Sequence, residues 1–291
     1  RLLRALERAK EADCLRLKEE LPCLEAALEG KEVLFGREEE KTFLDAEIAA
    51  YLLNPLKDSY SVEELAKEYL DLSVPSRAEL FGKESLAKAA EEKPGVFLTY
   101  GGYFSYVLYH SMPVLLERLR KTGMEKLYRE MEMPLVFTLY RMERAGVRVD
   151  AEALKAYGDE LALRIGELEK KIYEEAGETF NINSPKQLGV ILFDKMGMKG
   201  GKKTKTGYST SADVLEKLAP DYPIVADILE YRQLAKLKST YADGLAAYIG
   251  EDERIHTTFQ QTITATGRLS SVEPNSRFRR LCLSITKKEF Q

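Results

Sequence analysis

The most regular feature of the sequence is a stripe of apolar residues that begins shortly after Asp150. Its members recur at steps of three and four residues: Leu154, Tyr157, Leu161, Ile165, Leu168 and Ile172. This period is that of one face of an α-helix, and an aspartate before the first turn can cap free backbone N–H groups. The pattern predicts a helix longer than about 20 residues, which needs a second apolar face to pack against.

A second stripe with the same steps follows later in the chain: Leu234, Leu237, Tyr241, Leu245 and Tyr248. Two such helices can pack as an antiparallel hairpin, with the Gly/Lys/Thr-rich stretch 197–211 at its tip. The same stripes are also compatible with a coiled-coil arm that binds another protein. The patterns alone leave this choice open.

Length and composition favour a two-domain protein. The chain has 291 residues, 44% of them hydrophobic and 32% charged, with a net charge of −4 and a mean hydropathy of −0.33. No apolar run approaches the roughly 18 residues of a membrane span, and the three cysteines, Cys14, Cys23 and Cys282, fit no disulfide framework. We therefore expect a cytoplasmic protein without membrane contact. The first residue is not Met, which favours a fragment of a longer protein.

Three regions differ in their patterns. Residues 1–127 combine helical spacing, as at Val62, Leu65, Ala66 and Tyr69, with apolar runs at 31–35 and 96–100 that predict strands. Residues 128–250 are almost wholly helical in pattern. From Arg254 the alternation of residues 256–260 predicts a strand.

A local basic patch stands out in this acidic chain. Between Asn181 and Thr210 there are six lysines and one aspartate. On the second predicted helix Arg232, Lys236 and Ser239 share one face, a spacing suited to successive phosphates. Short polar side chains near helix starts add further donors: Asn181, Asn183, Ser184, Ser209, Thr210 and Ser211. Composition alone favours equally a solvated lysine-rich loop with helix caps.

The segment 264–271 is a weaker signal of the same kind. Gly267 permits close backbone approach, and Arg268 beside it offers a planar fork of donors for a phosphate or a base edge.

The order of these motifs closely resembles the bacterial DNA polymerases of family A. The segments that carry the resemblance are 132–135, 181–188, 208–211, 229–241 and 264–271, within a similarity over 40–275. It implies an α/β exonuclease-like (ribonuclease H-like) part at 1–127, incomplete at its N-terminus. It further implies the polymerase-domain start and a mostly α-helical thumb with the long antiparallel hairpin at 128–250. Residues 251–291 would begin an α+β palm with an atypical, truncated tail.

The resemblance also implies which residues contact DNA. Eight would meet the backbone of a primer–template duplex, namely Asn181, Asn183, Ser184, Ser209, Ser211, Arg232, Lys236 and Ser239. Thr264, Arg268 and Asn275 would lie nearer the primer terminus, with Arg268 in or near the minor groove. Neutral donors, Lys and Arg are the groups that hold a duplex without reading its sequence.

The sequence departs from the family at two sites. After Asn275 it runs Ser276-Arg277-Phe278-Arg279-Arg280 and lacks the palm carboxylates, so we expect no catalytic residue and no bound metal in this chain. Whether the natural product ends at Gln291 or the tail reflects a frame change stays open. In the exonuclease-like part, Phe104 stands where the resemblance leads us to expect an Asp. Asp45 is predicted to be a helix cap rather than a metal ligand.

The resemblance implies template-directed DNA synthesis in replication and repair by a DNA-directed DNA polymerase, a nucleotidyltransferase. Mg²⁺ and deoxynucleoside triphosphates are implied only for the full-length protein, because two-metal phosphoryl transfer needs the missing carboxylates. For this chain we expect an inactive monomer whose partner is primer–template duplex. The alternatives are a non-catalytic duplex-binding module and a helical interaction protein.

Overall fold

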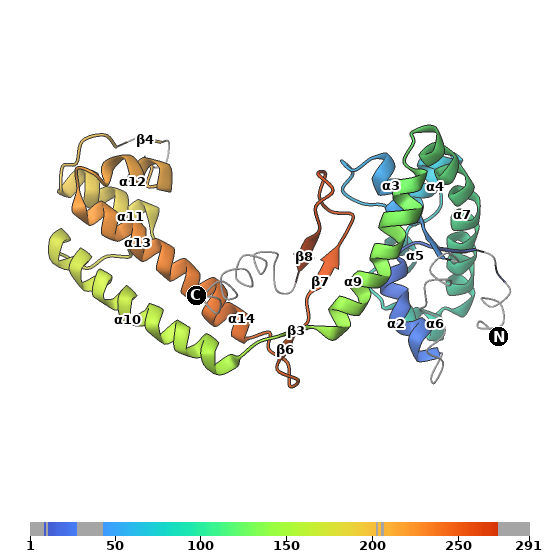
Figure 1. The fold of residues 1–291 in the computed structure, drawn as a ribbon. Coiled ribbons are helices and arrows are strands. Elements are labelled where there is room, and N and C mark those ends of the chain that lie inside the picture. The colour runs from blue at the N-terminus through green and yellow to red at the C-terminus, as the bar shows by residue number, and fades with distance from the viewer. Residues whose placement is uncertain (1–8, 10, 28–42, 202, 205–206, 273–291) are drawn as a thin grey trace. The chain divides into compact units, whose positions relative to one another are not determined.

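A computed structural model describes residues 9, 11–27, 43–201, 203–204 and 207–272 (Figure 1). The chain divides into two compact units, and each is described by itself. The first unit comprises residues 1–146 and 257–272, and the second comprises 147–256 and 273–291. The strand expected at 31–35, Asn275 and the tail from Ser276 lie outside the described residues.

The first unit packs helices around a short parallel sheet. Strand β1 (Ala12–Cys14) pairs in parallel with β2 (Phe43–Asp45), so that Cys14 lies opposite Asp45. The α-helices are α2 (Leu17–Ala27), α3 (Ala46–Leu53), α4 (Val62–Leu70), α5 (Arg77–Phe81), α6 (Leu86–Glu92), α7 (Pro94–Lys121), α8 (Glu125–Leu127) and α9 (Met133–Ala145). The π-helical segment η3 (Tyr128–Glu132) leads into α9.

Helix α4 forms where the apolar spacing places it. Val62, Leu65, Ala66 and Tyr69 are buried, which confirms the helix expected there. Its first turn carries a capping box, in which Ser61 accepts a hydrogen bond from Glu64 N and Glu64 accepts one from Ser61 N. Helices α3 and α4 both pack on α7, which forms one side of the core.

The strand expected at 96–100 is wrong, because these residues form the start of α7. Pro94 stands in the first turn, where the missing N–H costs nothing. A five-residue apolar run does not distinguish a strand from a helix. The longer helical spacing of Val107, Leu108, Met112, Leu115 and Leu119, all buried, sets the conformation of the whole segment.

The first unit also contains a hairpin from the C-terminal part of the chain. Strand β7 (Thr258–Gln260) pairs antiparallel with β8 (Ser270–Val272), with Thr258 opposite Val272 and Gln260 opposite Ser270. The strand predicted from the alternation of residues 256–260 is thus confirmed over its last three residues. The turn between these strands carries Thr264 and Arg268.

The second unit is built on α10 (Ala151–Ala176). Asp150 accepts a hydrogen bond from Ala153 N at 2.9 Å, and Leu154, Leu161, Leu168 and Ile172 are buried, which confirms the predicted long helix. The remaining elements are β3 (Val147–Arg148), α11 (Pro185–Gly189), η4 (Val190–Lys195), β4 (Lys203–Thr204), β5 (Gly207–Tyr208), α12 (Ala212–Leu218), α13 (Pro223–Leu237), η5 (Lys238–Asp243), α14 (Gly244–Ala246) and β6 (Arg254–Ile255).

Helices α10 and α13 pack along each other over a shared apolar core (Figure 1). Ion pairs flank this contact: Arg164 meets Glu230 at 2.8 Å, and Lys171 meets Asp227 at 2.7 Å. Lys171 comes after Arg164 in α10, whereas its partner Asp227 comes before Glu230 in α13. The two helices therefore run in opposite directions.

The second predicted stripe fails at its end. After Leu237 the backbone becomes the π-helical segment η5, which changes the phase of the side chains around the axis. Tyr248 lies beyond α14 and is 47% exposed, whereas Leu245 is buried. In the ranges described, no helix is both long and apolar enough to span a bilayer.

Candidate nucleic-acid interface

Arg232 of α13 joins two loops of the second unit. Its Nε donates to the carbonyl oxygen of Ile182 at 3.1 Å, and its Nη1 donates to that of Thr210 at 2.7 Å. The side chain is half-buried, and burial lowers the pKa of its guanidinium. Arg232 therefore links the loop at 181–184 to the loop at 209–211.

The first of these loops is ordered by its own polar groups. Asn181 Oδ1 accepts from Asn183 N at 3.0 Å, and Asn181 O accepts from Ser184 N at 2.9 Å. Ser184 caps α11 by accepting from Gln187 N at 3.4 Å. The side chains of Asn181 and Asn183 are exposed, whereas Ile182 between them is only 2% exposed.

The second loop shows the same alternation. Thr210 is 5% exposed, while Ser211 is exposed and Ser209 is half-buried. The two serine hydroxyls lie 3.1 Å apart. Gly189 of α11 lets β5 approach closely, because a Cβ atom there would lie 3.2 Å from Tyr208 Cβ. Each loop thus buries one residue and leaves a polar residue exposed beside it.

Lys236 and Ser239 are both exposed. Ser239 stands at the second residue of η5, and its hydroxyl donates to Lys236 O at 3.4 Å. In the described part of the chain, the Lys236 ammonium has no ion-pair partner. This cation is therefore available to an anion from outside.

One lysine of the lysine-rich stretch pairs with a carboxylate of its own unit. Lys195 forms an ion pair with Glu178, while Lys186 and Lys199 are exposed. Lys202 and Lys205 lie outside the described residues.

Thr264 and Arg268 belong to the first unit, in the turn after β7. Tyr51 of α3 donates to Thr264 O at 2.6 Å, and Gly267 N donates to the same oxygen at 3.1 Å. Gly267 has a φ of +72°, which favours glycine. Arg268 is exposed, and among the described residues its guanidinium has no hydrogen-bond or ion-pair partner.

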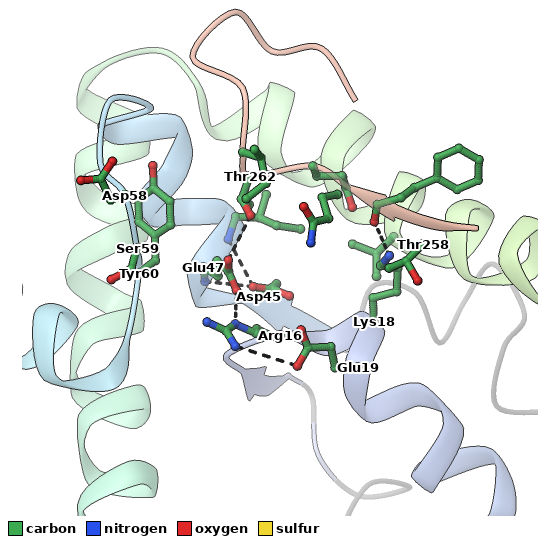
Figure 2. Close-up of a pocket in the computed structure, with 16 residues that line it drawn as sticks. Arg16, Lys18, Glu19, Asp45, Glu47, Asp58, Ser59, Tyr60, Thr258 and Thr262 are labelled. Atoms are coloured by element: carbon green, nitrogen blue, oxygen red, sulfur yellow. Dashed lines mark hydrogen bonds and ion pairs between the residues drawn. The ribbon is translucent and has the colours of Figure 1, made fainter. Parts of the chain in front are cut away.

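A pocket of about 290 Å³ lies beside this turn (Figure 2). On its wall Glu47 accepts from Thr262 Oγ1 at 3.0 Å and from Arg16 Nε at 2.7 Å. With the Tyr51 contact, this fixes the β7–β8 hairpin to α3. The sequence patterns gave no sign of these contacts, because residues so far apart in the chain meet only in the folded unit.

Asp45 lines this pocket and caps helix α3, which confirms the sequence prediction (Figure 2). Its carboxylate accepts from Glu47 N and Ile48 N at 2.9 and 3.2 Å, and from Leu17 N at 2.7 Å. The side chain is only 3% exposed. Burial raises the pKa of Asp45 to about 8, and the charge of Glu47 acts in the same direction, whereas the N–H donors lower it.

The residues around Asp45 do not fit a metal ion. Backbone N–H groups occupy both carboxylate oxygens, and Arg16 takes up the neighbouring Glu47 carboxylate. Within the described ranges no cluster of three or more His, Cys, Asp or Glu side chains is placed to hold a metal. Phe104, at the expected Asp position, is a partly buried residue packed on the core.

Comparison with known proteins covers most of the chain. The sequence profile of DNA polymerase family A matches residues 151–277. DNA polymerase I of Bacillus subtilis is 47% identical over 232 residues, which are 79% of this chain and 26% of that protein. DNA polymerase I of Streptococcus pneumoniae is 45% identical over 243 residues, 83% of this chain and 27% of that protein.

A solved structure agrees with these matches. The POL domain of Pol1 from M. smegmatis, in complex with DNA primer-template and dNTP, is 36% identical with a TM-score of 0.65, over 80% of this chain and 38% of that one. The helix-rich fold and the sequence thus resemble part of a DNA polymerase. The chain belongs to family A and is similar to bacterial DNA polymerase I. It spans about a quarter of the length of the curated relatives named here.

Proposed function

We propose that this chain is the part of a DNA polymerase I that holds the primer–template duplex during template-directed DNA synthesis. The observation that carries the proposal is the link from Arg232 to Ile182 O and Thr210 O. It ties together two loops with exposed polar side chains on the unit that also bears the exposed Lys236. Such a surface offers neutral donors and a cation to phosphates, as sequence-independent DNA binding requires.

In this proposal the second unit supplies most of a thumb. Residues 128–250 form the start of the polymerase domain and the thumb, with α10 and α13 as its antiparallel hairpin, and 251–291 begin the palm. Residues 1–127 form a degenerate exonuclease-like domain, which acts as a platform. The cap geometry of Asp45 supports the loss of exonuclease chemistry, since its oxygens are already satisfied by N–H groups.

The proposed DNA contacts are Asn181, Asn183, Ser184, Ser209, Ser211, Lys236 and Ser239 for the duplex backbone, with Arg232 between the two loops and Thr264, Arg268 and Asn275 nearer the primer end. Mg²⁺ and deoxynucleoside triphosphates belong to the whole polymerase. The relative from M. smegmatis, solved with primer-template and dNTP, supports this choice of partner.

A second candidate is a duplex-binding module without catalysis, favoured by the carboxylate of Asp45, whose oxygens already accept from backbone N–H groups. For both candidates we expect the chain to bind labelled primer–template without extending it when Mg²⁺ and nucleotides are present. Extension of the primer by this chain would contradict both.

Fluorescence anisotropy with a labelled primer–template tests binding itself. We expect affinity to fall steeply between about 50 and 200 mM salt, because phosphate contacts release counterions. A salt-insensitive or undetectable interaction would overturn the proposal in favour of a helical interaction protein.

A further inference from the structure

We infer that Arg232 acts on DNA mainly as a positioning residue, by fixing the loop at 181–184 relative to the loop at 209–211. This inference rests on the proposed function of the second unit. A residue on the outer face of a thumb helix would be expected to offer its guanidinium to a phosphate. In the structure, the guanidinium instead faces two backbone carbonyls of its own unit.

The carbonyls that Arg232 binds belong to the one buried residue of each loop. These residues, Ile182 and Thr210, are 2% and 5% exposed. The exposed Asn183 and Ser211 are their immediate neighbours in the chain. A shift of either carbonyl would therefore move the adjacent polar side chain, so the arginine sets the spacing between the two groups of donors.

The geometry requires arginine rather than a positive charge alone. The guanidinium presents donors on separate nitrogens of one rigid plane, and here Nε and Nη1 serve carbonyls from two different loops. The Thr210 hydroxyl also lies 3.5 Å from both Nη1 and Nη2. A lysine ammonium is a single point on a flexible stem and cannot hold the same two carbonyls in this arrangement.

The first experiment compares Arg232→Lys and Arg232→Ala with the unaltered chain in primer–template binding at several salt concentrations. If Arg232 positions the loops, both variants lose affinity by a similar factor of about ten, with little change in the salt dependence. If it contacts phosphate directly, Arg232→Lys keeps most of the affinity and Arg232→Ala lowers the salt slope by about one contact. The second result, or no loss in either variant, would overturn the inference.

A double-mutant cycle tests whether Arg232 acts through the loop that bears Asn183. Asn183→Ala is expected to weaken binding about fivefold in the unaltered chain, but to have almost no effect when Arg232 is already alanine. Equal effects of Asn183→Ala in both backgrounds would contradict a role through the loop. Arg164→Ala, which removes an exposed ion pair between α10 and α13, is the matched control and should leave binding unchanged.

Hydrogen exchange of the free protein keeps the inference testable if DNA does not bind. Arg232→Lys and Arg232→Ala should each speed exchange of the Asn183 and Ser184 amides by about tenfold, without affecting amides in the middle of α10. Failure of the unaltered chain to bind DNA would overturn the proposed function alone. Unchanged exchange at these loop amides would overturn the positioning role.

Discussion

The hydroxyl of Tyr128 forms hydrogen bonds with both backbone polar groups of Asp45, its N–H and its carbonyl. It accepts a hydrogen bond from Asp45 N at 2.8 Å and donates one to Asp45 O at 3.0 Å. Tyr128 is fully buried, and burial raises its pKa well above the usual value of a tyrosine. This contact ties the start of η3 to the point where β2 passes into α3.

Tyr128→Phe should therefore destabilise the first unit. The substitution leaves a buried N–H and a buried carbonyl without their partner, at a cost of about 1–3 kcal/mol in unfolding free energy. Urea unfolding measures the change. Tyr106→Phe, at a position 53% exposed, is the control and should stay within about 0.5 kcal/mol of the unaltered chain. Equal values for the two variants would contradict the importance of the contact.

The raised pKa of Asp45 predicts that the unfolding free energy of the chain depends on pH. Its pKa is raised to about 8 in the folded state from 3.8, so the folded chain holds the proton more tightly. The resulting stabilisation is complete below about pH 4 and is lost as pH rises through about 8. We expect the unfolding free energy of the unaltered chain, minus that of Asp45→Asn, to decrease as pH rises from about 5 to about 8.

Urea unfolding of both proteins at three pH values within this window measures that difference. Subtraction of the variant removes the contribution of the other titrating groups to first order. If the difference in unfolding free energy grows with pH, the three N–H donors affect the pKa of Asp45 more than burial does and keep its carboxylate ionised.

The cap geometry of Asp45 also predicts an absence of nuclease activity. Incubation of this chain with a 3′-labelled duplex and Mg²⁺ should leave the strand intact, because the Asp45 oxygens are occupied by backbone N–H groups. Removal of Mg²⁺ with a chelator provides the control. Trimming of the 3′ end that depends on the metal would contradict this reading of the site.

Arg268 should matter most at a primer terminus. Its guanidinium is exposed on a turn that Tyr51 and Glu47 fix to α3 through Thr264 and Thr262. Arg268→Ala should weaken binding to a recessed 3′ end more than binding to blunt duplex of equal length. Arg148→Ala, which removes another exposed arginine, is the control for charge. Equal losses on both DNAs, with the turn shown to be ordered by hydrogen exchange, would contradict the assigned role.

The sequence predicted those parts of the fold that depend on local patterns. The apolar spacing after Asp150 identified α10 and its cap, and the alternation of residues 256–260 identified β7. The segment at 96–100 was assigned wrongly, because a short apolar run is compatible with either conformation. The phase shift at η5 had no local signal, since a π-helical turn depends on the packing around it.

The candidate site was predictable only as a set of side chains. Lys236 and Arg268 are exposed, as groups that bind an external anion must be. The partners of Arg232 could not be predicted, because they are backbone carbonyls 50 and 22 positions away in the chain. Every residue has the same backbone carbonyl, so a sequence pattern cannot show which carbonyls lie near Arg232. Only the folded unit shows that Arg232 connects the loops.

The central claim, that the second unit binds the duplex backbone, is tested most directly by the salt slope of Lys236→Ala. The exposed ammonium of Lys236 suits one phosphate, so its removal should lower the slope of log affinity against log salt by roughly 0.9 on every duplex tested. Lys155→Ala, at an exposed position of α10 outside the proposed surface, should leave the slope unchanged. Identical slopes for the unaltered chain and both variants would contradict the account.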